Sequence, residues 1–274
     1  MSLSNNTQRV LVAAAAIPLI LAASYAGGIY FMLLILIIAF ASFFEFYSFT
    51  KNKGMMANIF FGLAGIAFLV INQKHYFFDF YSFTLLFIIL LTGVELFRNK
   101  GSAIYNISTT FLGTFYLGLL AGALISIREF YPEIGELYLR GGYLIITILV
   151  SIWICDTAAF YGGSKFGKHK LFLRVSPNKT WEGAIFGFFF AVITAILAKI
   201  LFLDFISVKT AFAIGIIVGT VGQIGDLVES LFKRDAGVKD SSGIIPGHGG
   251  VFDRFDSLLY TAPVILLYLK YIGR

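Results

Sequence analysis

Long, nearly uninterrupted runs of apolar residues constrain the fold of this chain more than any other feature. A transmembrane helix needs about 20 mostly apolar residues. Runs of this kind lie at 10–27, 28–48, 55–72, 80–97, 104–127, 142–163, 181–203, 207–226 and 257–272. They are continuous in hydrophobicity, whereas the strands of a membrane β-barrel alternate apolar and polar residues. The sequence therefore predicts an all-α integral membrane protein with about nine transmembrane helices.

Composition supports this fold class. Only 13% of the 274 residues are charged, about half of what is usual in soluble domains, and the mean hydropathy is +0.86. Arg9 and the apolar run after it are similar to a signal peptide, but that run leads through the short segment 26–28 directly into a second one, so we expect a retained helix. No polar linker divides the chain. We expect one polytopic domain over 1–274, in which 1–140 supplies N-terminal helices and 141–274 carries the functional motifs.

Several classes of site and partner are disfavoured. A single cysteine, Cys155, excludes an intramolecular disulfide, and together with only three histidines it argues against a zinc cluster. The net charge of +6 comes from bases placed between apolar runs, where membrane topology puts them. We therefore expect no nucleic-acid partner.

The distribution of basic residues predicts an orientation. With nine spans, 14 of the 21 lysines and arginines fall on the side of the N-terminus, which also holds the two long polar loops. Since cytoplasmic loops carry the excess of basic residues, we expect the N-terminus and both loops, 164–180 and 227–256, to be cytoplasmic.

The first polar loop is strongly basic. It contains five bases and no acid, at Lys165, Lys168, Lys170, Arg174 and Lys179. Such a cluster beside a membrane suits the phosphates of a lipid headgroup or a nucleotide, although an ordinary cytoplasmic loop would also be basic. Residues 162–168 match G-x-x-x-x-G-K, but His169 stands where a P-loop needs Ser or Thr, and no strand precedes it. We reject a P-loop.

The second polar loop begins as a helix that continues out of the eighth apolar run. Polar residues recur there at helical spacing on one face, namely Asp226, Glu229, Ser230, Lys233 and Arg234. One interpretation is a solvated helix end with a Glu229–Lys233 pair, worth about 0.3 kcal/mol. The other is a face of carboxylates and cations turned toward a site.

The rest of this loop leads into the last apolar run. Its glycines could let the backbone approach an anion, and His248 is either a phosphate donor or a structural hydrogen-bonding residue. Asp253 and Asp256 share a face of the next helix, where helix capping partly explains them. Topology brings both to the depth of Asp156 and Asp226, near the cytoplasmic interface. Clustered carboxylates at membrane depth need a cation, and Mg²⁺ prefers carboxylates combined with substrate phosphates.

The run SLFKRDAGVKDSSGIIPGHGGVFDRFDS resembles the signature of the phosphatidate cytidylyltransferases (CDP-diacylglycerol synthases). CDTAAFYGGSKFGKHK and VSPNKTWEG, further upstream, are similar to a second block of the same family. The fixed positions of the signature are met by Ser230, Lys233, Arg234, Lys239, Asp240, Pro246, His248, Gly249, Gly250, Asp253, Arg254 and Asp256.

The resemblance implies the reaction of CTP with phosphatidic acid to give CDP-diacylglycerol and pyrophosphate, with Mg²⁺ as cofactor, either alone or with a second cation. It also implies a multi-pass enzyme of the cytoplasmic membrane, in contact with membrane lipids. A homodimer is compatible with the sequence. We expect catalysis by Asp226, Lys233, Asp253 and Asp256, with the metal held by Asp226, Asp253 and Asp256. Substrate-binding residues are expected at Lys165, Lys168, Ser176, Lys179, Thr180, Arg234, Lys239, His248 and Arg254.

Two other functions have some support in the sequence. In an ion-coupled transporter the carboxylates would be cation or proton sites, but the two similar halves with broken helices that would favour it are absent from the sequence. A CDP-alcohol phosphotransferase also clusters aspartates in a membrane, but the signature D-G-x-x-A-R is missing.

Overall fold

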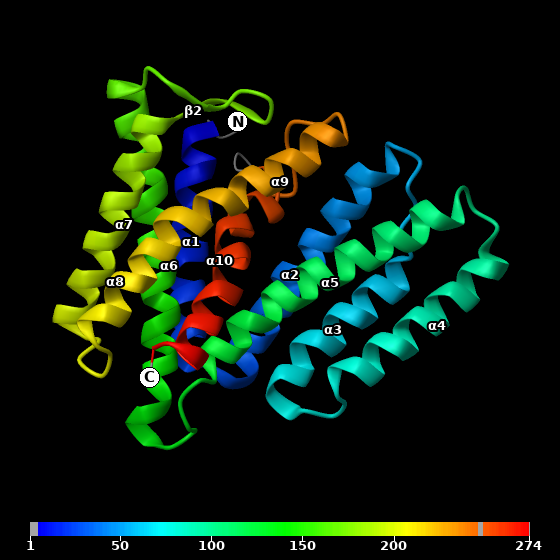
Figure 1. Ribbon diagram of the computed structural model, residues 1–274, viewed down its shortest axis with the longest axis horizontal. Helices are drawn as coiled ribbons and strands as arrows, with labels where there is room; N and C mark the ends of the chain where they lie inside the picture. The colour runs from blue at the N-terminus through cyan, green and yellow to red at the C-terminus, as the bar shows by residue number, and fades with distance from the viewer. Residues whose placement is uncertain (1–4, 246–248, 274) are drawn as a thin grey trace.

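The chain folds into a bundle of helices with one short β-hairpin (Figure 1). The computed structural model describes residues 5–245 and 249–273. The N-terminal part holds α1 (Asn5–Ala26), α2 (Gly28–Lys51), α3 (Ile59–His75), α4 (Phe80–Arg98) and α5 (Ala103–Arg128). The C-terminal part holds α6 (Gly135–Phe166), β1 (Lys170–Phe172), β2 (Ser176–Thr180), α7 (Trp181–Leu201), α8 (Val208–Ile217), η1 (Val218–Gly222), α9 (Gln223–Asp235) and α10 (Phe252–Tyr271).

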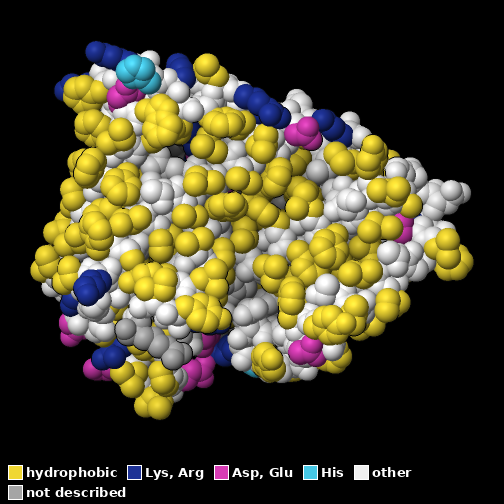
Figure 2. All heavy atoms as spheres, in the orientation of Figure 1, with side chains coloured by type: hydrophobic (Ala, Val, Ile, Leu, Met, Phe, Trp, Pro, Cys, Tyr) yellow, Lys and Arg dark blue, Asp and Glu magenta, His cyan; other side chains and the backbone are white. Residues whose placement is uncertain are grey.

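The prediction of a helical membrane protein is confirmed at this level. Among the described residues, six helical segments are long and apolar enough to cross a membrane: α2, α4, α5, α6, α7 and the continuous segment 208–235. The apolar parts of α1 and α3 are shorter. Figure 2 shows hydrophobic side chains over the middle of one face, with lysines and arginines mainly along its upper edge and at its lower left. The hairpin within the first polar loop was not predicted.

The predicted continuation of the eighth span is confirmed. α8, η1 and α9 follow one another without a break, and η1 is a π-helical turn inside an otherwise α-helical segment. Such a bulge changes the helical register locally and is frequent at functional sites. Here the amide of Gln223, the first residue after the bulge, donates to the carbonyls of Gly219 (2.5 Å) and Ala184 (3.0 Å), which ties the segment to α7.

The short segment between the first two helices is centred on Gly27. Its φ of 69° lies in the left-handed region, and a side chain there would collide with Arg128, since its Cβ would lie 2.2 Å from the Arg128 guanidinium. Arg128 is fully buried and donates to the carbonyls of Ser24 (2.7 Å), Tyr25 (2.8 Å) and Tyr138 (3.0 Å). The C-terminal end of α1 is therefore fixed to α5 and α6.

Glycines bring α6 and α7 close together. A Cβ at Gly183 would lie 2.7 Å from the carbonyl oxygen of Ala159, and one at Gly187 would lie 3.0 Å from that of Cys155. Small residues allow this approach in membrane helix pairs, where packing rather than hydrophobic exclusion drives association. The close pairing puts the beginning of α7 and the preceding hairpin beside the second half of α6.

The polar segments of the second half gather at one end of the bundle. The hairpin, the end of α9 and the N-terminal end of α1 lie there, whereas the turn between α7 and α8 lies at the opposite end (Figure 1). The connection after α2 also lies at this end, because Lys53 forms an ion pair there with Asp235, the last residue of α9 (3.2 Å). The two loops predicted to share a side of the membrane thus lie at the same end of the molecule.

Candidate active site

A cavity of about 880 Å³ lies at this end, between α1, α6, the hairpin, α7, α9 and α10. One part of its wall is polar and includes Asp156, Lys179, Asp226, Arg254 and Asp256. Another part is apolar. It is formed by Val12, Ala13, Ala16, Ile17 and Ile20 of α1 with Ile152, Trp153, Phe160 and Phe255. The cavity can thus accommodate a charged group and an apolar group side by side.

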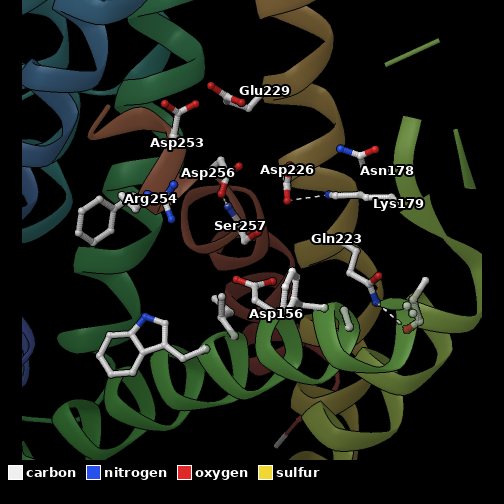
Figure 3. A pocket seen from close by; sticks show the side chains of 18 of the residues that line it. Asp156, Asn178, Lys179, Gln223, Asp226, Glu229, Asp253, Arg254, Asp256 and Ser257 are labelled. Carbon is white, nitrogen blue, oxygen red and sulfur yellow. Dashed lines mark hydrogen bonds and ion pairs between the residues drawn. The ribbon is translucent and has the colours of Figure 1, made fainter. Parts of the chain in front are cut away.

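Three aspartates from three different helices face the cavity (Figure 3). Asp156 comes from α6, Asp226 from α9 and Asp256 from α10. Asp256 is 7% exposed, and its Oδ1 accepts a hydrogen bond from the N–H of Ser257 (2.5 Å). Asp253 of α10 also borders this cavity, so all four carboxylates predicted to share a depth meet around it.

The hairpin contributes a cation to this group. Lys179 Nζ lies 2.6 Å from Asp226 Oδ2, and Asn178 also borders the cavity. β2 ends at Thr180, whose hydroxyl accepts from the N–H of Gly183 (3.2 Å) and caps α7. Because β2 leads directly into this cap, the position of Lys179 is set by the start of α7.

A buried ion triad lies on the α9–α10 side. Lys233 Nζ pairs with Glu229 Oε2 (2.7 Å), one turn earlier on α9, and with Asp253 Oδ1 (2.5 Å) of α10. The Lys233 side chain is 10% exposed, and the two acids are 1% and 8% exposed. Breaking a buried pair by removing one partner leaves an uncompensated charge. This triad fixes α10 against α9.

Asp253 is also bound by the turn before α10. Its Oδ2 accepts hydrogen bonds from the N–H of Gly250 (2.9 Å) and the N–H of Ser241 (3.2 Å). It also lies 3.0 Å from the Ser241 hydroxyl, whose single proton is shared between Asp253 and Glu45. Both oxygens of Asp253 thus have protein donors. Asp253 borders the cavity, and its hydrogen bonds hold the loop before α10 in place.

The same turn is held from the N-terminal half of the chain. Glu45 of α2, which is 1% exposed, accepts hydrogen bonds from the hydroxyls of Ser241 (2.8 Å) and Ser242 (2.6 Å). It also accepts from the N–H groups of Val251 and Phe252, both at 2.8 Å. α2 is therefore part of the support of the site, although its sequence reads as an ordinary membrane span.

The remaining predicted site residues differ in their positions. Arg254 lines the cavity. Arg234 points toward the hairpin and donates to the carbonyls of Val175 and Val238, both at 3.2 Å. Four others do not line this cavity: Lys165, Lys168, Ser176 and Lys239. His248 lies outside the described residues.

Lys165 instead borders a separate apolar groove between α6 and α7. The acid that the basic loop lacks is supplied by Glu182, at the start of α7. Glu182 Oε1 lies 2.6 Å from His169 Nδ1, and its carboxylate accepts from the N–H groups of Lys168 and His169. Lys179 is the one member of the five-base cluster that lines the cavity.

Comparison with known sequences identifies the family. Residues 7–272 match the model of the cytidylyltransferase family, which covers nearly the whole chain. The chain belongs to the cytidylyltransferase family. Both halves of the molecule are within the match, including α2 with Glu45.

Curated relatives of this cytidylyltransferase family member align over part of their length. Phosphatidate cytidylyltransferase of Staphylococcus aureus (strain COL) is 45% identical over 131 residues, which is 47% of this chain and 50% of the relative. The Staphylococcus saprophyticus protein of that name is 43% identical over 145 residues, or 51% and 55%. That of Haemophilus influenzae is 42% identical over 132 residues, or 45% and 44%. The chain thus matches about half the length of these relatives.

The side chains around the cavity of this family member include carboxylates that suit Mg²⁺. Among the described residues, no three acidic, histidine or cysteine side chains form a ready-made metal cage. Mg²⁺ does not require one, since it is commonly held by one or two carboxylates together with substrate phosphates and water. Asp226 and Asp256 face the same cavity and fit this pattern. Protein donors also approach both oxygens of Asp226, namely Lys179 at 2.6 Å and the Ser230 hydroxyl at 3.4 Å. Asp253, the third predicted ligand, accepts from more donors, which come from Lys233, Ser241 and Gly250.

Four residues that line or support the site were not predicted from the sequence: Glu45, Ser241, Gln223 and Asn178. Glu45 could have been found, because an acid inside a 24-residue apolar helix is costly unless it has partners. The role of Gln223 depends on the π-helical turn before it, for which the sequence gives no signal. Asn178 is one of several polar residues in a loop, and only the folded hairpin shows that it borders the cavity.

Proposed function

We propose that the protein is a phosphatidate cytidylyltransferase, which converts CTP and phosphatidic acid to CDP-diacylglycerol and pyrophosphate. The observation that carries the proposal is one cavity that combines Asp156, Asp226, Asp256 and Lys179 with an apolar wall from α1 and α6. A nucleotide requires the polar part. A lipid requires both parts, because its phosphate is charged and its chains are apolar.

In this reaction a phosphate oxygen of phosphatidic acid attacks the α-phosphorus of CTP. A P–O bond forms there, and the bond from the α-phosphorus to the oxygen bridging to the β-phosphorus breaks. That oxygen keeps the electron pair and leaves as part of pyrophosphate. The nucleophile is already an anion, so no strong general base is needed. Catalysis then depends mainly on positioning and on stabilising negative charge.

The position of each residue determines its contribution to catalysis. Lys179 and Arg254 neutralise phosphate oxygens in the polar part of the cavity. The apolar residues of α1 and α6 hold the beginning of the acyl chains and exclude water from the reacting groups. Lys233, with Glu229 and Asp253, keeps α10 in place, so that Asp256 faces the nucleotide. The bulge before Asp226 and the bonds of Gln223 fix the orientation of α9.

Asp226 and Asp256 are the residues proposed to hold Mg²⁺, with Asp156 beside them. When bound, the ion would act as a Lewis acid and as a template for the triphosphate. Asp226 is paired with Lys179 at 2.6 Å, so this ion pair must loosen when a cation and phosphates share the site.

The topology is part of the proposal. We infer about nine membrane spans, with α1, α3 and α10 added to the six long apolar segments. The N-terminus and the cavity face the cytoplasm, where CTP is found. The whole chain then forms one multi-pass domain of the cytoplasmic membrane, and the basic surface around the hairpin lies close to anionic headgroups.

An omission assay tests the function. Protein purified in detergent is incubated with CTP, Mg²⁺ and phosphatidic acid, and pyrophosphate is measured with each of the three left out in turn. We expect release only when all three are present. Release without phosphatidic acid would indicate a CTP hydrolase, and no release with any nucleotide would leave the ion-coupled transporter as the better account of the carboxylates.

A further inference from the structure

Glu45 lies in the C-terminal third of an apolar helix and far in sequence from every motif of the site. It is 1% exposed, and α2 otherwise buries mainly phenylalanine and isoleucine side chains. An ionised carboxylate in such surroundings is costly unless donors surround it. The donors it has all come from one short part of the chain, about 200 residues later.

The four hydrogen bonds form a regular pattern. Oε1 accepts from the Ser242 hydroxyl (2.6 Å) and the N–H of Val251 (2.8 Å). Oε2 accepts from the Ser241 hydroxyl (2.8 Å) and the N–H of Phe252 (2.8 Å). Each oxygen therefore joins the beginning of the 241–252 segment to its end.

The two backbone donors belong to the first turn of α10. The first N–H groups of a helix have no partner within the helix, and Val251, at the N-cap position, makes no side-chain capping bond. Glu45 supplies this cap from another helix. A negative charge there also interacts favourably with the helix dipole.

The packing at this point leaves no room for adjustment. A Cβ at Gly250 would lie 1.8 Å from the Ser241 hydroxyl oxygen and 2.5 Å from Glu45 Oε2. The backbone of the turn therefore approaches the carboxylate so closely that only glycine fits. A change in Glu45 must move the turn, and with it the start of α10.

α10 carries Arg254 and Asp256, which line the cavity. We propose that Glu45 is a positioning residue for the nucleotidyl transfer: it caps α10 from α2 and thereby sets the direction in which Asp256 faces the cavity. The catalytic consequence of this inference rests on the proposed function. The cap itself rests only on the contacts of Glu45.

The test compares Glu45→Gln with Glu95→Gln. Glu95 is a matched control, since it is a buried acid in another helix, 5% exposed and bonded to Asn106 and Arg98, and it does not line the cavity. For each variant we would measure kcat and KM for CTP, the thermal unfolding midpoint in detergent, and amide hydrogen exchange in peptides that cover 238–256. Gln keeps the volume of Glu but faces two of the four donors with an NH₂ group.

For Glu45→Gln we expect kcat to fall about tenfold or more, with KM for CTP changed less than about threefold and with faster exchange at Val251 and Phe252. In Glu95→Gln, kcat and the amide hydrogen exchange rates of 238–256 should stay at their wild-type values, even if the thermal unfolding midpoint falls. Ser242→Ala should reduce kcat in the wild-type chain but much less in Glu45→Gln, since the two residues share one bond.

Three results would overturn the inference. The first is wild-type exchange at Val251 and Phe252 in Glu45→Gln, which would exclude the cap whatever the activity. The second is a normal kcat despite faster exchange, and the third is an equal fall of kcat in Glu95→Gln. If the wild-type protein releases no pyrophosphate, the proposed function fails, while the exchange comparison still decides whether Glu45 caps α10.

Discussion

Lys179 Nζ lies 2.6 Å from Asp226 Oδ2, and this ion pair joins the β-hairpin to α9 in the polar part of the cavity. The two side chains are 29% and 36% exposed, so both can be reached by solutes. A lysine in this position can exchange its carboxylate partner for a phosphate oxygen. The pair therefore marks where we expect the triphosphate to enter.

Replacing Lys179 tests this role. Lys179→Met keeps the length of the side chain and removes its charge, and we expect KM for CTP to rise about tenfold, because a hydrogen bond to a charged group is lost. The matched control is Lys170→Met, in the other strand of the hairpin and outside the cavity. Steady-state kinetics at varied CTP would measure the effect, and equal KM values for the two variants would contradict it.

Replacing either carboxylate proposed to hold Mg²⁺ should change both the rate and the Mg²⁺ requirement of the reaction. Asp226→Asn and Asp256→Asn should each lower kcat by about a hundredfold or more, since electrostatic stabilisation of the transition state is lost. More Mg²⁺ should also be needed for half-maximal activity. Asp235→Asn, on α9 but in a surface pair with Lys53, should behave like the wild-type protein. Unchanged Mg²⁺ dependence in both site variants would count against the ligand assignment.

Asp253 should behave differently from these two residues. Both its oxygens are held by the protein, through Lys233 on one side and Ser241 and Gly250 on the other. We expect Asp253→Asn to lower kcat and the thermal unfolding midpoint, because the turn and the ion triad loosen together. The Mg²⁺ concentration for half-maximal activity should stay the same. A large increase in that concentration would restore Asp253 as a metal ligand.

The orientation can be tested with single cysteines. The native Cys155 is 2% exposed and should not react with a membrane-impermeant maleimide. Cysteines introduced as Lys168→Cys and Lys239→Cys lie at the cavity end, and Asp204→Cys lies in the turn between α7 and α8 at the opposite end. In intact cells we expect labelling of the Asp204 variant alone, and of all three after permeabilisation. The reverse pattern would invert the proposed topology.

The sequence predicted the helical membrane fold because each apolar run is a local signal. It also predicted that Asp156, Asp226, Asp253 and Asp256 would approach one another, since the predicted topology alone brings the relevant ends of their helices to one depth. The extension of α6 to 32 residues could not be foreseen. The first turns of that helix contain Glu136 and Arg140, which interrupt the apolar pattern without stopping the helix.

Side-chain partners were harder to predict. Spacing on α9 placed Lys233 and Arg234 together, but in the structure Lys233 turns inward to Asp253 and Arg234 turns toward the hairpin. Adjacent residues on a helix point about 100° apart, and only the packing of α10 and the hairpin shows which of the two faces the site. The partners of Glu45 could not be predicted, because they lie about 200 residues away in the sequence.

The most direct test of the central claim follows the α-phosphate of CTP. Purified wild-type protein and the Asp256→Asn variant are incubated with α-phosphate-labelled CTP, Mg²⁺ and phosphatidic acid, and the label in the extracted lipid is compared with the pyrophosphate released. We predict that the wild-type protein transfers label to lipid in equimolar amount with pyrophosphate, and that the folded variant transfers about a hundredfold less. Pyrophosphate without labelled lipid, or equal transfer by both proteins, would contradict nucleotidyl transfer at this cavity.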